Sequence, residues 1–302
     1  MHKYLAALTI LFLVACQPEP PSEPAQPAAP EPMAEPEPAA AVDPLGAALD
    51  AQSDEAKARY VYRHPRETLE FFGVEPGMTV VEGLPGGGWY SKILLPYLGS
   101  EGRLIGADYS MDMWRLFSFA SEEFLAEQAG WVDSFPQDAR EWAGGNGASV
   151  AAFTFGDMPG EFAGTADVVL MIRALHNLAR FSGGERDFLG EALADAYAAL
   201  KPGGILGIVQ HEARDGMSDE FAGGSNGYLK KSRVVAAAEQ AGFELVAESD
   251  LNANPKDQPT EDDIVWRLPP TLATSAEDPD LRAELEAVGE SNRMTLKFRK
   301  PE

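Results

Sequence analysis

The 302-residue sequence contains a single cysteine, Cys16. One cysteine cannot form an internal disulfide, and it cannot supply a zinc site built from several thiolates. Basic residues are also few, because 24 lysines and arginines stand against 48 aspartates and glutamates, for a formal net charge of −24. This balance argues against binding nucleic acid or an anionic membrane face through charge, since either needs a basic surface. It favours a cationic or neutral substrate, although much of the charge is expected simply to solvate the surface.

The N-terminus has no apolar run long enough to cross a bilayer. Residues 4–14 are apolar and follow Lys3, which is the length and pattern of a signal peptide. They end in Leu-Val-Ala-Cys at residues 13–16, which resembles a bacterial lipobox. The resemblance implies removal of residues 1–15 and lipidation of Cys16, whose acyl chains would anchor the protein. Gln17 then implies the outer membrane of a Gram-negative cell, facing the periplasm. The alternative is an ordinary secretory signal.

Composition divides the rest of the chain into two parts. Residues 16–45 are rich in proline, glutamate and alanine, a composition that buries too little apolar surface to fold, and they are predicted to form a tether. Residues 46–302 are enough for one α/β domain, and the 45% content of hydrophobic residues suffices for its core.

A glycine turn at residues 86–88 is the most informative motif of this domain. An apolar segment ends at Glu82, and Gly-Leu-Pro-Gly-Gly-Gly then leads into a predicted helix. Consecutive glycines let backbone N–H groups come close to a ligand. About 20 residues later a second predicted strand ends at Asp108, the position that binds ribose hydroxyls in dinucleotide-type folds. An ordinary strand-to-helix turn is the alternative for the glycines alone.

The turn also fits a nicotinamide cofactor poorly and excludes a Walker-type phosphate site. It lacks the last glycine of G-x-G-x-x-G, and no Gly-Lys-Ser/Thr follows as in a phosphate-binding loop. A cofactor that has a ribose, an adenine and a cationic amino-acid arm, but no phosphates, fits the motif better.

Over residues 60 to 300 the chain resembles the class I S-adenosylmethionine-dependent methyltransferases. Residues 82–88 resemble their acid-x-Gly-x-Gly-x-Gly loop, although Leu84 stands where the family prefers glycine. Asp108 resembles their ribose-binding acid, and residues 155–158 resemble the adenine contact. Residues 166–172 resemble the fourth strand, which leads to the reaction centre. The glycine turn and residues 252–257 are also similar to a bacterial subfamily of predicted methyltransferases.

The resemblance implies an α/β fold with a Rossmann-like seven-stranded sheet, mostly parallel with an antiparallel last strand, and helices on both faces. The sequence itself shows the same alternation of strands and helices. Strands are predicted at residues 78–83, 104–107, 149–155, 168–172, 205–210, 243–248 and 293–299. Helices are predicted at residues 53–62, 65–72, 91–98, 111–125, 188–200 and 232–241. Residues 250–292 have little periodicity and are predicted to be a lid or insertion over the acceptor site.

Ligands of open α/β sheets bind at the carboxyl ends of the strands, where the predicted site residues gather. The resemblance assigns S-adenosylmethionine to Glu82, Gly83, Pro85, Gly86, Gly87, Gly88, Asp108, Tyr109, Asp157, Met158 and Arg173. Glu82 would balance the charge of the cofactor's amino group, or else cap the following helix. Asp157 is equally compatible with a plain turn. Trp89 and Tyr90 are candidates for cation–π contact with a sulfonium, with core packing as the alternative.

Methyl transfer to a hydroxyl or a protonated amine needs a base, and histidine is the natural one near neutral pH. His176, after the fourth strand, is the first candidate, and a histidine satisfied by backbone at a helix start is its alternative. His211, after the fifth strand, is the second, and Asn177 completes the predicted catalytic set. Arg63 and Arg66 could hold an acidic group of a substrate. Nothing in the sequence resembles a metal-ligand set.

The sequence therefore predicts a methyltransferase acting on a small-molecule or envelope acceptor, without nucleic acid, and touching the bilayer only through its lipid. S-adenosylmethionine is made in the cytosol, so a protein outside the inner membrane has no obvious supply of it. Exported cofactor is one answer, and a second is that the prediction of secretion is wrong. The third is a non-catalytic binding module that keeps the fold for a nucleoside-like or other small ligand.

Overall fold

The computed structural model describes residues 43–302. The predicted signal peptide, Cys16 and the tether up to residue 42 lie outside the described residues. The tether was expected to reach residue 45, but helix α1 (Pro44–Asp50) already begins at Pro44, where the Asp43 carboxylate accepts a hydrogen bond from the Gly46 N–H. No helix within residues 43–302 is long and apolar enough to cross a membrane.

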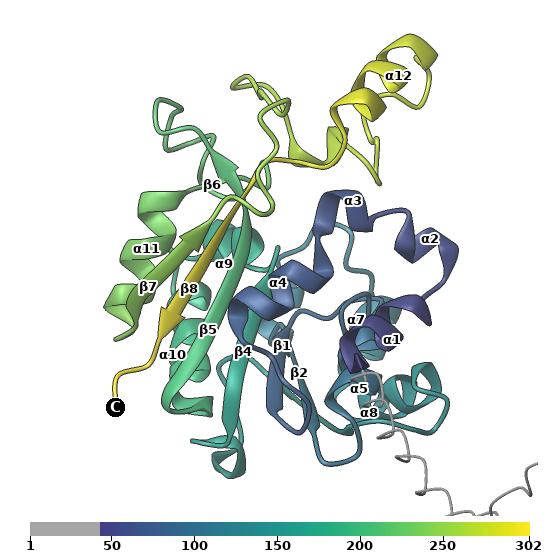
Figure 1. The fold of residues 1–302 in the computed structure, drawn as a ribbon. Helices are drawn as coiled ribbons and strands as arrows, with labels where there is room; N and C mark the ends of the chain where they lie inside the picture. Colours follow the sequence, from purple (N-terminus) through teal and green to yellow (C-terminus); the bar gives the residue numbers. More distant parts are fainter. Residues whose placement is uncertain (1–42) are drawn as a thin grey trace, which may run out of the picture. The chain divides into compact units, whose positions relative to one another are not determined.

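An eight-stranded sheet forms the centre of the fold (Figure 1). Its main path runs β3-β2-β1-β4-β5-β8-β7, and the short β6 pairs with the end of β5. The strands are β1 (Thr79–Gly83), β2 (Arg103–Asp108), β3 (Ser149–Thr154), β4 (Ala166–Ile172), β5 (Leu200–Ala213), β6 (Leu229–Lys230), β7 (Glu244–Ser249) and β8 (Arg293–Arg299). Strands β1 to β5 pair in parallel, whereas β8 lies between β5 and β7 and is antiparallel to both. The predicted fold class is confirmed, with β6 as an additional strand.

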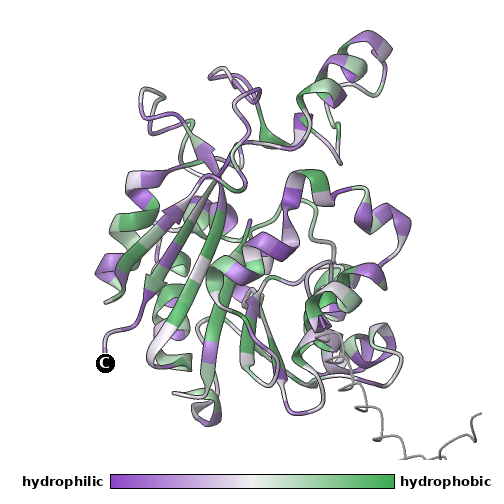
Figure 2. Cartoon of the chain, viewed as in Figure 1, coloured by the Kyte–Doolittle hydropathy of each residue, from purple (hydrophilic) through white to green (hydrophobic). Residues whose placement is uncertain are grey.

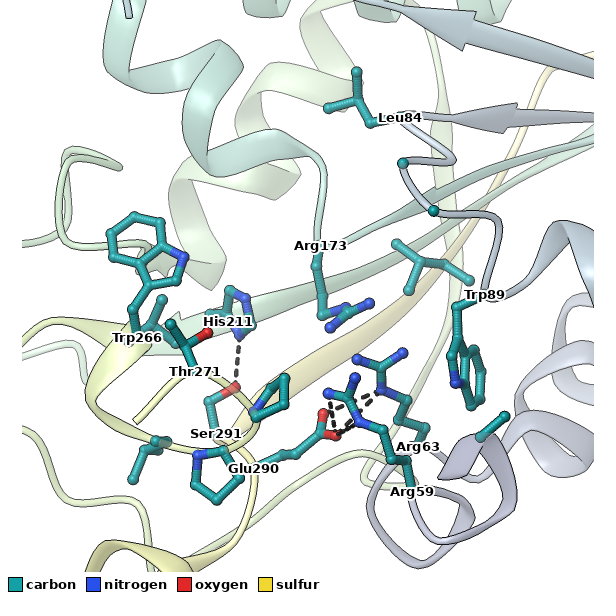
Figure 3. Close-up of a pocket in the computed structure, with 18 of the residues that line it drawn as sticks. Arg59, Arg63, Leu84, Trp89, Arg173, His211, Trp266, Thr271, Glu290 and Ser291 are labelled. Atoms are coloured by element: carbon teal, nitrogen blue, oxygen red, sulfur yellow. Dashed lines mark hydrogen bonds and ion pairs between the residues drawn. The ribbon is translucent and has the colours of Figure 1, made fainter. Parts of the chain in front are cut away.

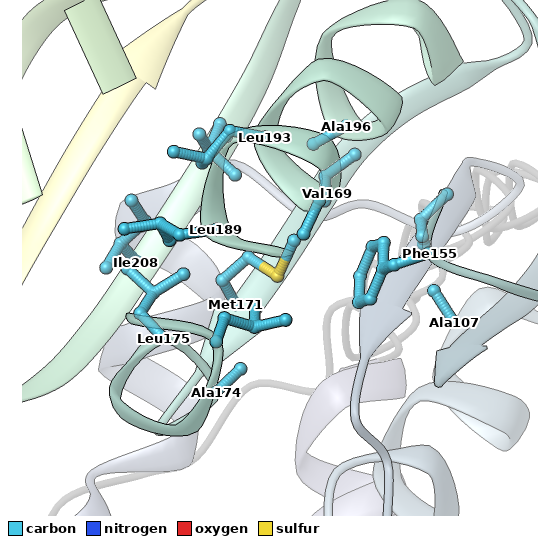
Figure 4. Close-up of a cluster of buried hydrophobic side chains, with 14 of the residues drawn as sticks. Ala107, Phe155, Val169, Met171, Ala174, Leu175, Leu189, Leu193, Ala196 and Ile208 are labelled. Atoms are coloured by element: carbon cyan, nitrogen blue, oxygen red, sulfur yellow. The ribbon is translucent and has the colours of Figure 1, made fainter. Parts of the chain in front are cut away.

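Helices cover both faces of the sheet, and successive buried residues of β1, β2 and β4 alternate between two cores. In β1, Val81 belongs to the core under α9 (Leu175–Phe181), α10 (Phe188–Ala199) and α11 (Lys231–Gln240). Val80 belongs to the core under α1, α4 (Pro65–Phe72) and α5 (Ser91–Leu98). Figure 4 shows the first core, where Leu189 and Leu193 of α10 meet Val169, Met171 and Ile208 of the sheet. In Figure 2 the strands are predominantly hydrophobic, and the helices carry both kinds of residue.

The remaining elements precede or connect the strands. They are α2 (Asp54–Lys57), α3 (Tyr60–Arg63), α4 (Pro65–Phe72), α5 (Ser91–Leu98), α6 (Met111–Trp114), α7 (Glu122–Gln128), α8 (Trp131–Trp142), α12 (Pro279–Val288) and the 3₁₀ turns η1 (Gly160–Phe162) and η2 (Val265–Arg267).

Two predicted helices prove to be interrupted. The helix expected over residues 111–125 is split into α6 and α7, because Ser110 and Ser121 each accept a hydrogen bond from a backbone N–H three residues on and so start separate helices. The helix expected over residues 53–62 is likewise two short ones, α2 and α3. Helix α8 was not predicted, and its internal Pro136 obscures the helical pattern.

The predicted insertion, residues 250–292, is held to the domain by a buried network. The Asp257 carboxylate accepts from Arg267 Nη2 at 2.8 Å, and Arg267 Nη1 donates to the Tyr228 hydroxyl at 2.9 Å. The same carboxylate accepts from the Asn292 N–H, next to β8. This network positions residues 265–271 beside the ends of β4 and β5.

Candidate functional site

A cavity of about 730 Å³ opens at the carboxyl ends of β1, β4 and β5 (Figure 3). Its volume lies within the roughly 300–1,000 Å³ of small-molecule sites. The walls come from the turn at residues 84–87, from Ile172, Arg173 and His176 around the end of β4, and from His211 of β5. Parts of α2 and α3, residues 265–271 and the pair Glu290–Ser291 complete the cavity. The predicted insertion therefore contributes one wall.

The glycine turn presents open backbone to this cavity. A Cβ atom at Gly86 or Gly87 would meet nothing within 4 Å, whereas one at Gly88 would overlap the Trp142 ring. Leu84 has a left-handed φ of 56°, and its N–H donates to the Ala107 carbonyl at 2.7 Å. The side chain of Leu84 packs against the apolar core. Packing against Trp142 explains why residue 88 is a glycine. At Gly87 neither packing nor the backbone conformation requires a glycine.

Glu82 lies buried at the end of β1, under the turn. Its carboxylate accepts a hydrogen bond of 2.6 Å from the hydroxyl of Ser91, the first residue of α5. Burial raises the pKa of Glu82 to about 7, although the Ser91 hydroxyl and the charge of Arg173 act in the opposite direction. Glu82 therefore ties β1 to α5 and holds a titrating charge close to the cavity.

The predicted adenosine-binding residues lie outside the cavity lining. Asp108 is buried at the end of β2, and burial raises its pKa to about 7. The Tyr109 ring packs edge-on against Trp114, with ring centroids 4.9 Å apart, and its hydroxyl accepts from Asn177 Nδ2 at 3.2 Å. Asn177 thus lies beside Tyr109 and not in the cavity, contrary to the catalytic position expected for it. Past the end of β3, Asp157 is exposed and Met158 half-buried.

His176 and His211 both line the cavity, with ring centroids 5.5 Å apart. Burial lowers the pKa of His176 to about 4, and its Nδ1 has no hydrogen-bond partner within residues 43–302. The pKa of His211 is also lowered, first by burial and then by His176 and nearby arginines. Its Nδ1 lies 2.6 Å from the Ser291 hydroxyl. If Nδ1 of His211 carries the proton, it donates a hydrogen bond to the Ser291 hydroxyl, and Nε2 is then unprotonated and can act as a base.

Arginines surround a single carboxylate, that of Glu290, next to Ser291 in the cavity wall. Glu290 Oε1 lies 2.6 Å from Arg59 Nη2 and 3.2 Å from Arg63 Nε, and Oε2 lies 3.4 Å from Arg293 Nη1. The guanidinium of Arg173 points into the same space (Figure 3). Burial and neighbouring cations lower the pKa of Arg63 to about 9 and that of Arg173 to about 10.

The net charge of the chain therefore misrepresents its cavity. Four cations line it, Arg59, Arg63, Lys92 and Arg173, against the two carboxylates of Glu55 and Glu290. The charge of −24 therefore does not support a cationic substrate at this site, because only local charges set the local potential.

Several cavity residues were missed in the sequence. Arg59, Trp266, Glu290 and Ser291 were not predicted individually as site residues, although the last three belong to the segment 250–292 that was expected over the acceptor site. For Arg59 the only signal was its spacing four residues before Arg63, which places both on one helix face. The face of Trp89, a candidate for a sulfonium contact, is instead covered by Arg63, whose guanidinium carbon lies 4.5 Å from the ring centroid. Within residues 43–302 no three His, Cys, Asp or Glu side chains gather as a metal site.

Comparison with known proteins gives similar folds only. No family model matches the chain, and no curated protein matches it in sequence. A SAM-dependent methyltransferase from Aquifex aeolicus is similar in structure, with a TM-score of 0.47 and 16% identity over 86% of this chain and 99% of that one. A geranyl diphosphate C-methyltransferase from Streptomyces coelicolor, solved with S-adenosyl-L-homocysteine, has a TM-score of 0.49 and 16% identity, over 84% of this chain and 87% of that one. The [4+2]-cyclase SpnF has a TM-score of 0.46 and 15% identity, over 79% of this chain and 80% of that one. Similarity at this level does not by itself establish a reaction.

Proposed function

We propose that this protein is an S-adenosylmethionine-dependent methyltransferase whose acceptor binds in the 730 Å³ cavity. The observation that carries the proposal is the glycine turn after β1, which exposes the backbone of Gly86 and Gly87 to the cavity at the position where open α/β sheets bind ligands. The antiparallel β8 between β5 and β7 supports it, because the methyltransferase sheet differs in this strand from the nicotinamide-binding one.

The chain's residues fit the cofactor in part. Backbone N–H groups of the turn and the Glu82 carboxylate would hold the amino-acid arm, whose ammonium group complements an ionised carboxylate. Asp108 would accept hydrogen bonds from the ribose hydroxyls. It lies next to the turn, because the Leu84 N–H donates a hydrogen bond to the carbonyl of Ala107, the residue before Asp108. The Tyr109 and Trp114 rings pack against each other beside Asp108, so we expect them to move when adenosine binds.

When bound, the cofactor supplies an electrophilic methyl group on a sulfonium. The chain would place the acceptor against residues 265–271 and withdraw its proton through His176 or His211. Both histidines stay neutral at pH 7, since their pKa values are lowered, and so can accept a proton. Ser291 is proposed as a positioning residue that fixes the tautomer of His211.

Calorimetric titration of the purified protein tests the cofactor directly. We expect S-adenosylmethionine and S-adenosylhomocysteine to bind and NAD not to, because the turn lacks the dinucleotide pattern. Absence of affinity for both sulfur compounds would overturn the proposal and favour the non-catalytic binding module.

We also propose that the protein is a lipoprotein of the outer membrane, facing the periplasm. The support is the Leu-Val-Ala-Cys sequence at residues 13–16 followed by Gln17. Cells that express the full chain should incorporate labelled palmitate into it, and Cys16→Ser should abolish the label and leave the precursor uncleaved. Equal labelling of both forms would contradict the assignment.

A further inference from the structure

The arginine side chains around the cavity outnumber the carboxylates that pair with them. Arg59, Arg63 and Arg293 share the one carboxylate of Glu290, whose side chain is 4% exposed. Arg173 makes no hydrogen bond or ion pair through its side chain within residues 43–302, and its Nε is a buried donor without a partner. Buried charges normally have partners, because removing an ion from water is costly. This excess is notable in a chain with twice as many acidic as basic residues.

Arg63 and Arg173, which both have donors without a partner in the described part of the chain, line the cavity and reach it from two sides. Arg63 is 3% exposed and uses Nε for Glu290, while its Nη1 is buried and has no partner among the described residues. Arg63 comes from α3 and Arg173 follows β4, so they approach the same space from different elements (Figure 3). A guanidinium presents its donors in a fixed fork that matches carboxylate and phosphate oxygens.

The backbone of Arg173 is held in an unfavourable conformation. Its φ is 60°, in the left-handed region that non-glycine residues seldom adopt, and its N–H donates to the Val209 carbonyl of β5. Such strain costs on the order of 1–3 kcal/mol and gathers at ligand sites. Here it directs a charged side chain into the cavity.

A purely structural role explains only part of the cluster. The contacts of Glu290 with Arg59 and Arg63 join residues 231 and 227 positions apart, and so tie α3 to the start of β8. This role uses Arg59, Arg293 and one face of Arg63. It leaves Arg173 and Arg63 Nη1 unexplained.

We propose that Arg63 and Arg173, assisted by Arg59, bind the anionic group of the methyl acceptor, a small carboxylate or phosphate compound with an apolar body. The apolar body would lie against Ile172, Val265 and Trp266, which line the cavity near His176. The identification of the ligand as a methyl acceptor rests on the proposed function. The anion site itself does not depend on it.

Probes of one shape and different charge test the site. Benzoate and phenyl phosphate share a ring with neutral benzyl alcohol and cationic benzylamine, and binding can be followed by the fluorescence of Trp89 and Trp266, which line the cavity. At low ionic strength we expect both anions to bind at least about 10-fold more tightly than the alcohol, and the amine not to bind, since each tenfold step requires only one good charged contact. Equal affinities for all four would overturn the proposal.

Arg173→Gln is the decisive variant. A structural arginine would lower the melting temperature when removed, whereas Arg173 has no ion pair within residues 43–302 to lose. We therefore expect an unchanged or higher melting temperature, together with about 10- to 100-fold weaker benzoate binding. Arg66→Gln is the matched control, because Arg66 pairs with Asp43 outside the cavity and should not affect benzoate. Retained benzoate affinity in Arg173→Gln would contradict the proposal.

Saturation with S-adenosylhomocysteine separates the acceptor from the cofactor's own carboxylate. If the arginines serve an acceptor, benzoate should bind with similar affinity in its presence. Loss of benzoate binding would show that the arginines hold the cofactor's carboxylate, and the acceptor assignment would fall. Benzoate binding without any affinity for S-adenosylhomocysteine would instead refute the methyltransferase proposal and leave the anion site standing.

Discussion

Replacing Gly87 by leucine is expected to remove cofactor binding while leaving the fold intact. Gly87 has no left-handed φ, and a Cβ placed on it meets nothing within 4 Å, so the turn itself can accept a side chain. The leucine would occupy space that the turn shares with the cavity and would keep a ligand from the backbone N–H groups. Hydrogen bonds to a charged group contribute about 1.5–3 kcal/mol each, so binding should weaken by about 10- to 100-fold or more.

The measurement is calorimetric titration with S-adenosylhomocysteine, accompanied by a thermal unfolding curve. Gly216→Leu is the matched control, because Gly216 also has open surroundings and no left-handed φ but does not line the cavity. We expect normal melting temperatures for both variants and normal affinity for the control alone. Unimpaired binding by the Gly87 variant would show that the turn does not hold the cofactor.

Replacing Glu82 by glutamine is expected to stabilise the protein at high pH and to weaken cofactor binding. The pKa of Glu82 is raised from 4.5 to about 7 by burial, so the folded state binds a proton that the unfolded chain has released over this range. Folding stability contributed by this group is therefore present below pH 4.5 and is lost as the pH rises through 7. A pKa shift of this size lowers the free energy of unfolding by about 3 kcal/mol at pH 8.

Glutamine removes the titration and can still accept the hydrogen bond from Ser91. In urea unfolding, Glu82→Gln should leave the free energy of unfolding unchanged near pH 4.5 and raise it by up to about 3 kcal/mol at pH 8. Glu101→Gln, at an exposed glutamate, is the control. Calorimetry at pH 8 should show about 10- to 100-fold weaker binding of S-adenosylhomocysteine, because its ammonium group loses a charged partner. A pH-independent difference in stability would mean that Glu82 is not held neutral by burial.

Local patterns were sufficient to predict the framework. Helix α5 and strand β8 have the predicted bounds, Ser91–Leu98 and Arg293–Arg299, because an uninterrupted run of apolar or alternating residues sets each of them. Splitting of the helix at residues 111–125 was missed, since a serine that caps a new helix resembles a serine on a helix surface. Helix α8 was missed for a comparable reason, as Pro136 normally marks the end of a helix.

The sequence alone determined the class of sheet, the glycine turn and the acids at the ends of β1 and β2, because each depends on residues that are neighbours in the chain. Only the tertiary structure decided the charge of the cavity. Pairing of β8 with β5 places Arg293 opposite His211 and so brings Glu290 and Ser291 to the end of the sheet. There they meet Arg59 and Arg63, which are more than 200 positions away in the sequence. Composition sums charges over the whole chain, whereas the potential in a cavity depends on the few groups that strand pairing places around it.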